Sequence, residues 1–148
     1  MMLSLSEAVE KVEALDPAGQ DLLRAVLVEA VYKKAPFHKL KRGEDFGSLI
    51  SSGLVLQIDE PVGVILSGDL EKVRRKLCTY LSRRNENESY YDPDLDRFVD
   101  IPKGSQFVAT VTIGTEGTGT SLALEFPDDE ITELLDRYGV NRCRGWKS

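Results

Sequence analysis

The segment LVLQIDEPVGVIL, from Leu54 to Leu66, contains two short apolar runs separated by Asp59-Glu60-Pro61. Each run has the length and the β-branched composition of a strand, and a polar triplet with a proline is typical of a turn. The segment therefore predicts a β-hairpin, with strands over residues 54–58 and 62–66.

Helical patterns precede this hairpin. Ser4 and Glu7 have the spacing of a capping box, and apolar residues then recur at helical intervals as far as Leu15. Asp16-Pro17 combines an N-cap residue with a proline suited to the first helical position, so a second helix is expected from there to about Lys34. A basic loop over residues 35–43 and a short helix over residues 45–52 complete the first part of the chain.

The remaining elements are read in the same way. A third long helix is expected over residues 70–84, followed by a polar loop over residues 85–96. Alternation then predicts a half-buried hairpin with strands over residues 106–113 and 120–126, in which Leu122, Leu124 and Phe126 share one face. Asp128 caps a last helix that ends at Gly139.

This order favours antiparallel hairpins packed against amphipathic helices over a doubly wound parallel sheet. We therefore predict an α+β fold, built as one domain over residues 1–148 with a possible subdivision into 1–84 and 85–148. Three helices followed by a hairpin is also the order of a winged-helix domain. An N-terminal winged-helix-like part with a C-terminal α+β extension is the alternative.

The chain has no apolar stretch of the roughly 20 residues that a membrane-spanning helix requires. Its first residues lack the pattern of a secretory signal, and its two cysteines, Cys78 and Cys143, form no disulfide framework. We expect a cytoplasmic protein with reduced thiols and no membrane partner.

Charge is unevenly distributed along a chain whose net charge is −6. Residues 1–23 carry one basic and five acidic side chains, residues 24–84 twelve and seven, and residues 85–148 six and thirteen. The central block has a net charge of +5.

On the helix over residues 70–84, the cations fall opposite the apolar arc, which is the arrangement that suits contact with an anionic partner. We predict that cations of this helix face and of the preceding loop bind nucleic acid or an acidic protein. They are Lys39, Lys41, Arg42, Lys72, Arg75, Lys76 and Arg83. The alternative interpretation is a solvated helix face whose cations pair with neighbouring carboxylates.

An acidic loop offers a weaker candidate site. Asp92, Asp94, Asp96 and Asp100 have the 1, 3, 5, 9 spacing of a calcium loop, but Arg97 replaces the glycine and Lys103 the final glutamate of that motif. A solvated acidic loop is the simpler interpretation, with Ca²⁺ binding as the alternative.

Catalytic signatures are weak, and no cofactor motif is recognised. His38 is the single histidine and lies among lysines, so we expect it at the surface. Tyr90, Tyr91 and Trp146 lie outside the periodic segments and are candidate anchors of a protein interface, which favours a protein partner or a homo-oligomer as a second hypothesis. An enzyme with a carboxylate site is the third. The sequence favours a small non-enzymatic binding or regulatory protein.

Overall fold

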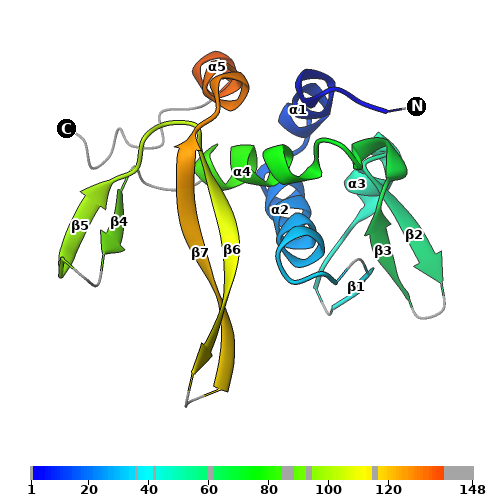
Figure 1. Cartoon of the computed structure of the whole chain (residues 1–148). Coiled ribbons are helices and arrows are strands. Elements are labelled where there is room, and N and C mark those ends of the chain that lie inside the picture. The colour runs from blue at the N-terminus through cyan, green and yellow to red at the C-terminus, as the bar shows by residue number, and fades with distance from the viewer. Residues whose placement is uncertain are drawn as a thin grey trace. The chain divides into compact units, whose positions relative to one another are not determined.

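The computed structural model describes residues 2–35, 37–41, 43–59, 62–84, 89–92, 95–114 and 117–138, with the backbone alone over 89–92, 107–114 and 117–124. The described part contains five α-helices, a short 3₁₀ helix and seven strands, and every strand pair is antiparallel (Figure 1). These elements confirm the predicted α+β class. The backbone falls into two compact units, Met1–Cys78 and Thr79–Ser148, each of which is described by itself.

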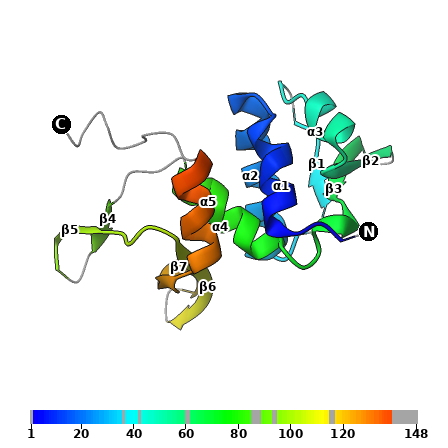
Figure 2. The same cartoon turned by 90° about the horizontal axis from the view of Figure 1, so that it is seen from above.

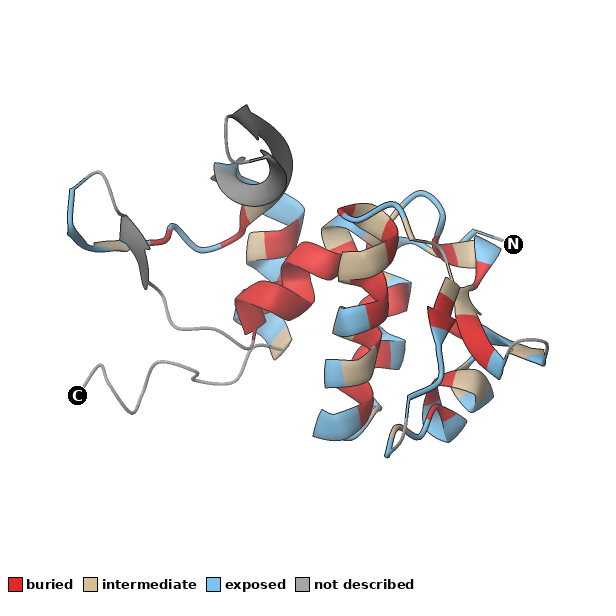
Figure 3. Ribbon diagram, turned by 90° about the horizontal axis from the view of Figure 1, so that it is seen from below, coloured by how far each residue is buried: buried red, intermediate tan, exposed pale blue. Residues whose placement is uncertain are grey.

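Two helices open the first unit. In α1 (Leu5–Glu13), Glu7 N–H donates to Ser4 Oγ and Ser4 N–H donates to Glu7 Oε1, which completes the predicted capping box. In α2 (Pro17–Val31), the Asp16 carboxylate caps the helix and proline occupies the first position. Each helix has one buried and one exposed face (Figure 3), and the buried faces form a large part of the core of this unit.

A three-stranded sheet lies beside α2 (Figures 1 and 2). Its order is β1-β3-β2, with β1 (Phe37–Lys39), β2 (Val55–Asp59) and β3 (Val62–Leu66). The hairpin of β2 and β3 is the predicted one, whereas β1 lies in the segment expected to be a loop. A three-residue strand is too short to show a period, and β1 owes its conformation to pairing with β3, which follows it by more than twenty residues. The short helix α3 (Gly47–Ser52) precedes β2 and ends at Gly53, whose φ of +83° suits a glycine.

The third long helix begins later than predicted. After a 3₁₀ turn, η1 (Gly68–Leu70), the helix α4 runs over Arg74–Arg84 and crosses the boundary between the two units. Leu77, Tyr80 and Leu81 are fully buried, as their apolar arc predicts. Thr79 and Arg83, which the helical projection places opposite the apolar arc, are buried as well, and residues 77–84 are buried all round.

The second unit continues with two hairpins and a helix: β4 (Ser89–Asp92) with β5 (Arg97–Asp100), β6 (Ser105–Gly114) with β7 (Gly117–Pro127), and α5 (Asp129–Tyr138). The segment expected to be a polar loop thus contains β4. Asp128 caps α5 as predicted, since its Oδ1 accepts from the backbone N–H groups of Glu130 and Ile131.

Phe126 does not follow the predicted alternation. The register of β6 and β7 shifts by one residue between Ser105, which faces Pro127, and Phe107, which faces Leu124. Such a bulge places an extra residue in one strand and breaks the two-residue period. Phe126 is therefore 91% exposed, and its predicted place on the half-buried face is wrong.

Candidate functional site

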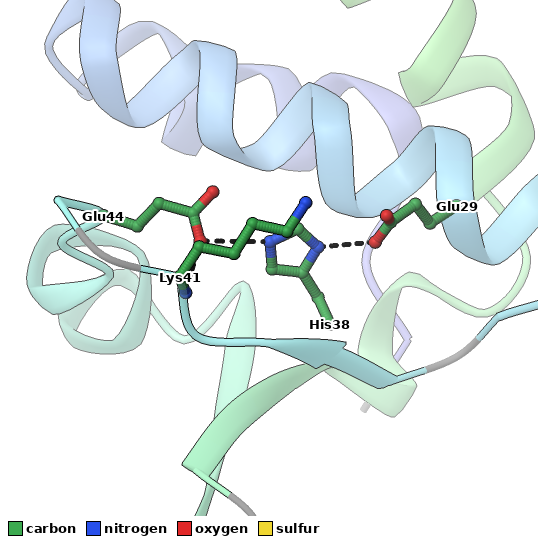
Figure 4. A network of polar contacts seen from close by, with 4 residues as sticks. All are labelled: Glu29, His38, Lys41 and Glu44. Atoms are coloured by element: carbon green, nitrogen blue, oxygen red, sulfur yellow. Dashed lines mark hydrogen bonds and ion pairs between the residues drawn. The ribbon is translucent and has the colours of Figure 1, made fainter.

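His38 is a buried residue held between two carboxylates (Figure 4). Its side chain is 3% exposed, Nδ1 lies 2.5 Å from Oε1 of Glu29 in α2, and Nε2 lies 3.3 Å from Oε1 of Glu44. The same Glu44 oxygen accepts the backbone N–H of Lys41 at 3.0 Å. The expectation of a surface histidine is wrong, because pairing of β1 with β3 turns this position toward α2 rather than toward solvent.

These contacts define the chemistry of the ring. An ionised carboxylate only accepts hydrogen bonds, so both contacts are made together only when both ring nitrogens carry a proton. The arrangement therefore fits an imidazolium that joins α2, β1 and the loop before α3. Because both nitrogens are engaged by carboxylates, the ring serves here as a cross-link within the unit.

The two carboxylates do not form a metal site with the ring. They contact nitrogens on opposite sides of the imidazole, so the three side chains do not converge on one point (Figure 4). Across the described residues, no group of three His, Cys, Asp or Glu side chains is placed to hold a metal ion.

A cavity of about 280 Å³ lies next to this cross-link, between the sheet and the start of α3. Glu44 and Asp45 contribute carboxylates to its wall and Gln57 of β2 contributes an amide. Its apolar wall comes from Leu40, Phe46, Ile50, Val62 and Val64. Neither carboxylate is fully buried, and the buried polar side chains of the described chain include no Asp or Glu.

Three predicted cations, Lys72, Arg75 and Lys76, lie just before and within the first turn of α4. Together with Arg74 they form a compact group, defined here as the basic cluster. Lys72 and Arg75 are exposed, Lys76 is half-buried, and Arg74 forms a 3.7 Å ion pair with Glu71. Sequence reasoning missed Arg74, because the helical projection assigned cations only to the arc opposite the core.

The position of the basic cluster on the helix has an electrostatic consequence. Arg74, Arg75 and Lys76 occupy the first turn of α4, which contains no acidic residue. The helix N-terminus already carries a partial positive charge, which makes this turn favourable for anions and unfavourable for cations. Cations and helix dipole therefore reinforce one positive potential at this end of α4.

The cations of the preceding loop lie elsewhere in the first unit. Lys39 pairs with Gly63 near the start of β3, and Lys41 lies two residues after Lys39. The strand β3 ends at Leu66, and α4 begins after that end, at Arg74. At about 3.3 Å per residue, Gly63 and Leu66 are roughly 10 Å apart along this strand. Lys39 and Lys41 are exposed, but the strand separates them from the basic cluster.

Two other predicted cations take different places. Arg83 is 5% exposed and its Nη2 donates to the carbonyl oxygens of Ile101 and Pro102, so it does not share the exposed surface of Lys72 and Arg75. Arg42 lies outside the described residues.

The acidic segment forms a hairpin rather than a loop. Asp92 pairs with Arg97 and Asp100 pairs with Ser89, which places these two aspartates at opposite ends of the β4–β5 ladder. Asp96 adopts the left-handed conformation in the turn, with φ +52°, and Asp94 lies outside the described residues. The backbone does not bring Asp92 and Asp100 together, and calcium binding stays a prediction.

The predicted aromatic anchors are described only in part. Tyr90 and Tyr91 belong to β4, where the backbone alone is described, and Trp146 lies outside the described residues. An interface through these side chains therefore stays a prediction.

The winged-helix alternative also stays a prediction. The described helix α3, with the sequence GSLISS, contains no Lys or Arg that would read base edges.

Comparison of the chain with protein-family models, with curated proteins and with solved structures finds no match. Among the described helices, none combines the length and the apolar character that crossing a membrane requires.

Proposed function

We propose that this protein is a small non-enzymatic binding protein whose basic cluster docks onto an acidic segment of a partner protein. The observation that supports this proposal is the concentration of Arg74, Arg75 and Lys76 in the first turn of α4. Cations in this position cost helix stability, typically about 0.3–1 kcal/mol each. Their charge adds to the positive potential of the helix end, which suits an anionic ligand.

The size of the basic cluster favours an acidic protein over nucleic acid. Four cations lie within five residues, and the exposed Lys39 and Lys41 are at the far end of β3. Proteins whose DNA affinity depends steeply on salt make about 6–10 phosphate contacts. A compact cluster within a chain of net charge −6 suits a short anionic segment better than a long polyanion.

The test is a titration of the purified full chain with labelled ligands over about 50–200 mM salt, where phosphate-driven binding changes steeply. The ligands are a peptide of alternating Glu and Ser, the matched Gln and Ser peptide, and single- and double-stranded DNA and RNA. We expect the acidic peptide to bind, the neutral peptide to fail, and salt to weaken the complex.

Two outcomes contradict the proposal. If DNA or RNA binds much more tightly than the acidic peptide, nucleic acid replaces the acidic protein as partner. If neither class of ligand binds at the lowest salt concentration, the basic cluster is a solvated helix end.

A further inference from the structure

The strand β2 presents an open edge. It is the outer strand in the order β1-β3-β2, and Ser67 N–H donates to Leu54 O at 3.0 Å, which sets the phase of the ladder. Residues 56 and 58 accordingly turn their backbone groups toward β3, whereas those of Gln57 and Asp59 point away from the sheet. In the part of the chain that the structure describes, these outward groups make no backbone hydrogen bond beyond the sheet.

The edge lacks several of the features that usually block strand addition. Val55–Asp59 contains no lysine and no proline, and its pairing with β3 has no bulge. Apolar side chains of the β2–β3 hairpin are exposed as well, since Leu56 and Val62 are 49% and 47% exposed. A strand added here would cover apolar surface and satisfy backbone groups at the same time.

The cavity lies on one side of this edge. Gln57 contributes to its wall from β2, and cross-strand neighbours on one face of a sheet lie about 4.5–5.5 Å apart. A residue placed opposite Gln57 by an added strand would direct its side chain toward the cavity. Its volume of about 280 Å³ is below the roughly 300–1,000 Å³ of small-molecule sites, and suits a single apolar side chain.

The charges around the edge are acidic. Asp45 belongs to the cavity wall beside Glu44, which His38 contacts, and Asp59 is two residues from Gln57, on the same face of β2. The cations Lys39 and Lys41 belong to or follow β1, at the other edge of the sheet. The β2 edge therefore favours a ligand with a positive charge beside its apolar residue.

We infer that the β2 edge binds an extended segment of a partner protein as a fourth strand, with an apolar side chain in the cavity and a Lys or Arg beside Asp59. Backbone hydrogen bonds to Gln57 and Asp59 supply affinity. The cavity and the carboxylates supply preference for alternate residues of the segment, because successive side chains of a strand point to opposite faces.

The probe for this site is the peptide acetyl-Ser-Lys-Val-Leu-Val-Ser-amide, titrated into the ¹⁵N-labelled full chain. We expect the amide signals of Gln57, Asp59 and Ile50 to shift, and binding to weaken about tenfold or more, a change of 1.4 kcal/mol or more, in Gln57→Pro. Proline removes an outward N–H and no bond to β3, and the matched control Gln57→Ala retains that N–H. Asp59→Asn should also weaken binding, and should reduce its dependence on salt.

A ligand-side control keeps the inference testable if Gln57→Pro unfolds. N-methylation of the central Leu amide blocks pairing without changing the protein, and exchange of Lys for Glu reverses the complementary charge. The inference is overturned if the unmodified peptide does not bind, or if the methylated peptide binds equally well. It is also overturned if sedimentation shows a dimer that Gln57→Pro dissociates, because a second copy would then occupy the edge.

Discussion

His38 shows how one side chain joins three segments of the first unit. The ring is buried, and its two nitrogens contact Glu29 of α2 and Glu44 before α3. Removal of such a group leaves two partly buried carboxylates without their partner, and a buried polar group left without a hydrogen bond costs about 1–3 kcal/mol.

We therefore expect His38→Ala to lower the free energy of unfolding by about 1–3 kcal/mol, measured by urea denaturation. Lys39→Ala, at the exposed neighbouring position, is the matched control and should stay within about 0.5 kcal/mol of the unchanged protein. Equal stability of the two variants would contradict the cross-link.

Ser4 gives a second prediction for a single residue. The pKa of Glu7 is lowered, chiefly by the hydrogen bond from the Ser4 backbone N–H and further by the Ser4 side chain. Ionised Glu7 therefore stabilises the folded state at pH values above its ordinary pKa, and this contribution disappears as the pH falls through the lowered value.

Ser4→Ala removes the side-chain contribution and keeps the backbone N–H, so the pKa of Glu7 should rise only part of the way toward its ordinary value. Loss of the cap should destabilise the protein by about 1 kcal/mol. An NMR titration of the Glu7 carboxyl group measures the first effect, and denaturation measures the second. Ser6→Ala, inside α1, is the control. An unchanged Glu7 titration in Ser4→Ala would show that the Ser4 side chain does not contribute to this pKa.

At the scale of elements, Gly104 fixes how α5 meets the start of β6. Its φ is +80°, and a Cβ atom at this position would overlap the Thr132 side chain and lie 3.1 Å from the Asp128 carbonyl oxygen. The Asp128 N–H donates to Gly104 O at 2.9 Å, so the two segments are also joined through their backbones.

Gly104→Ala should destabilise the protein by more than Gly43→Ala. Gly43 has a φ of +88° with nothing near its missing Cβ, so its variant shows the backbone strain alone, about 1–2 kcal/mol. The excess cost of Gly104→Ala, measured by urea denaturation, reports the overlap with Thr132. If the two variants lose the same free energy of unfolding, α5 moves away from the new Cβ atom at residue 104 without a measurable cost.

Elements with a clear period were predictable, and elements defined by pairing were not. The capping box at Ser4, the Asp16-Pro17 helix start and the hairpin of β2 and β3 follow local rules and are confirmed. The strand β1 has three residues and depends on β3, so no local pattern indicates it. The same pairing buries His38, whose lysine-rich neighbourhood in the sequence suggests exposure.

The candidate cations were predictable only where the helix is open to solvent. Lys72 and Arg75 are exposed as the helical projection indicates, but residues 77–84 are enclosed, and Arg83 is buried with them. A projection of one helix gives the apolar face, and it contains no information about how many neighbours surround the opposite face.

For the whole molecule, α4 links the two compact units along the chain. The boundary at Cys78 and Thr79 falls inside this helix, so unfolding of either unit removes hydrogen bonds from a helix that both contain. We therefore expect a single cooperative transition. Amide signals of Leu27 and Leu134, followed in urea, should disappear with the same midpoint, and two separated midpoints would contradict this expectation.

The most direct test of the proposed function compares charge reversal at two places. Lys72→Glu, Arg75→Glu and Lys76→Glu together change the basic cluster, and Lys39→Glu with Lys41→Glu changes the loop at the far end of β3. We predict that the first variant no longer binds the labelled acidic peptide, because its side chains repel the carboxylates of the ligand. The loop variant should retain binding, whereas full binding by the cluster variant would contradict the account.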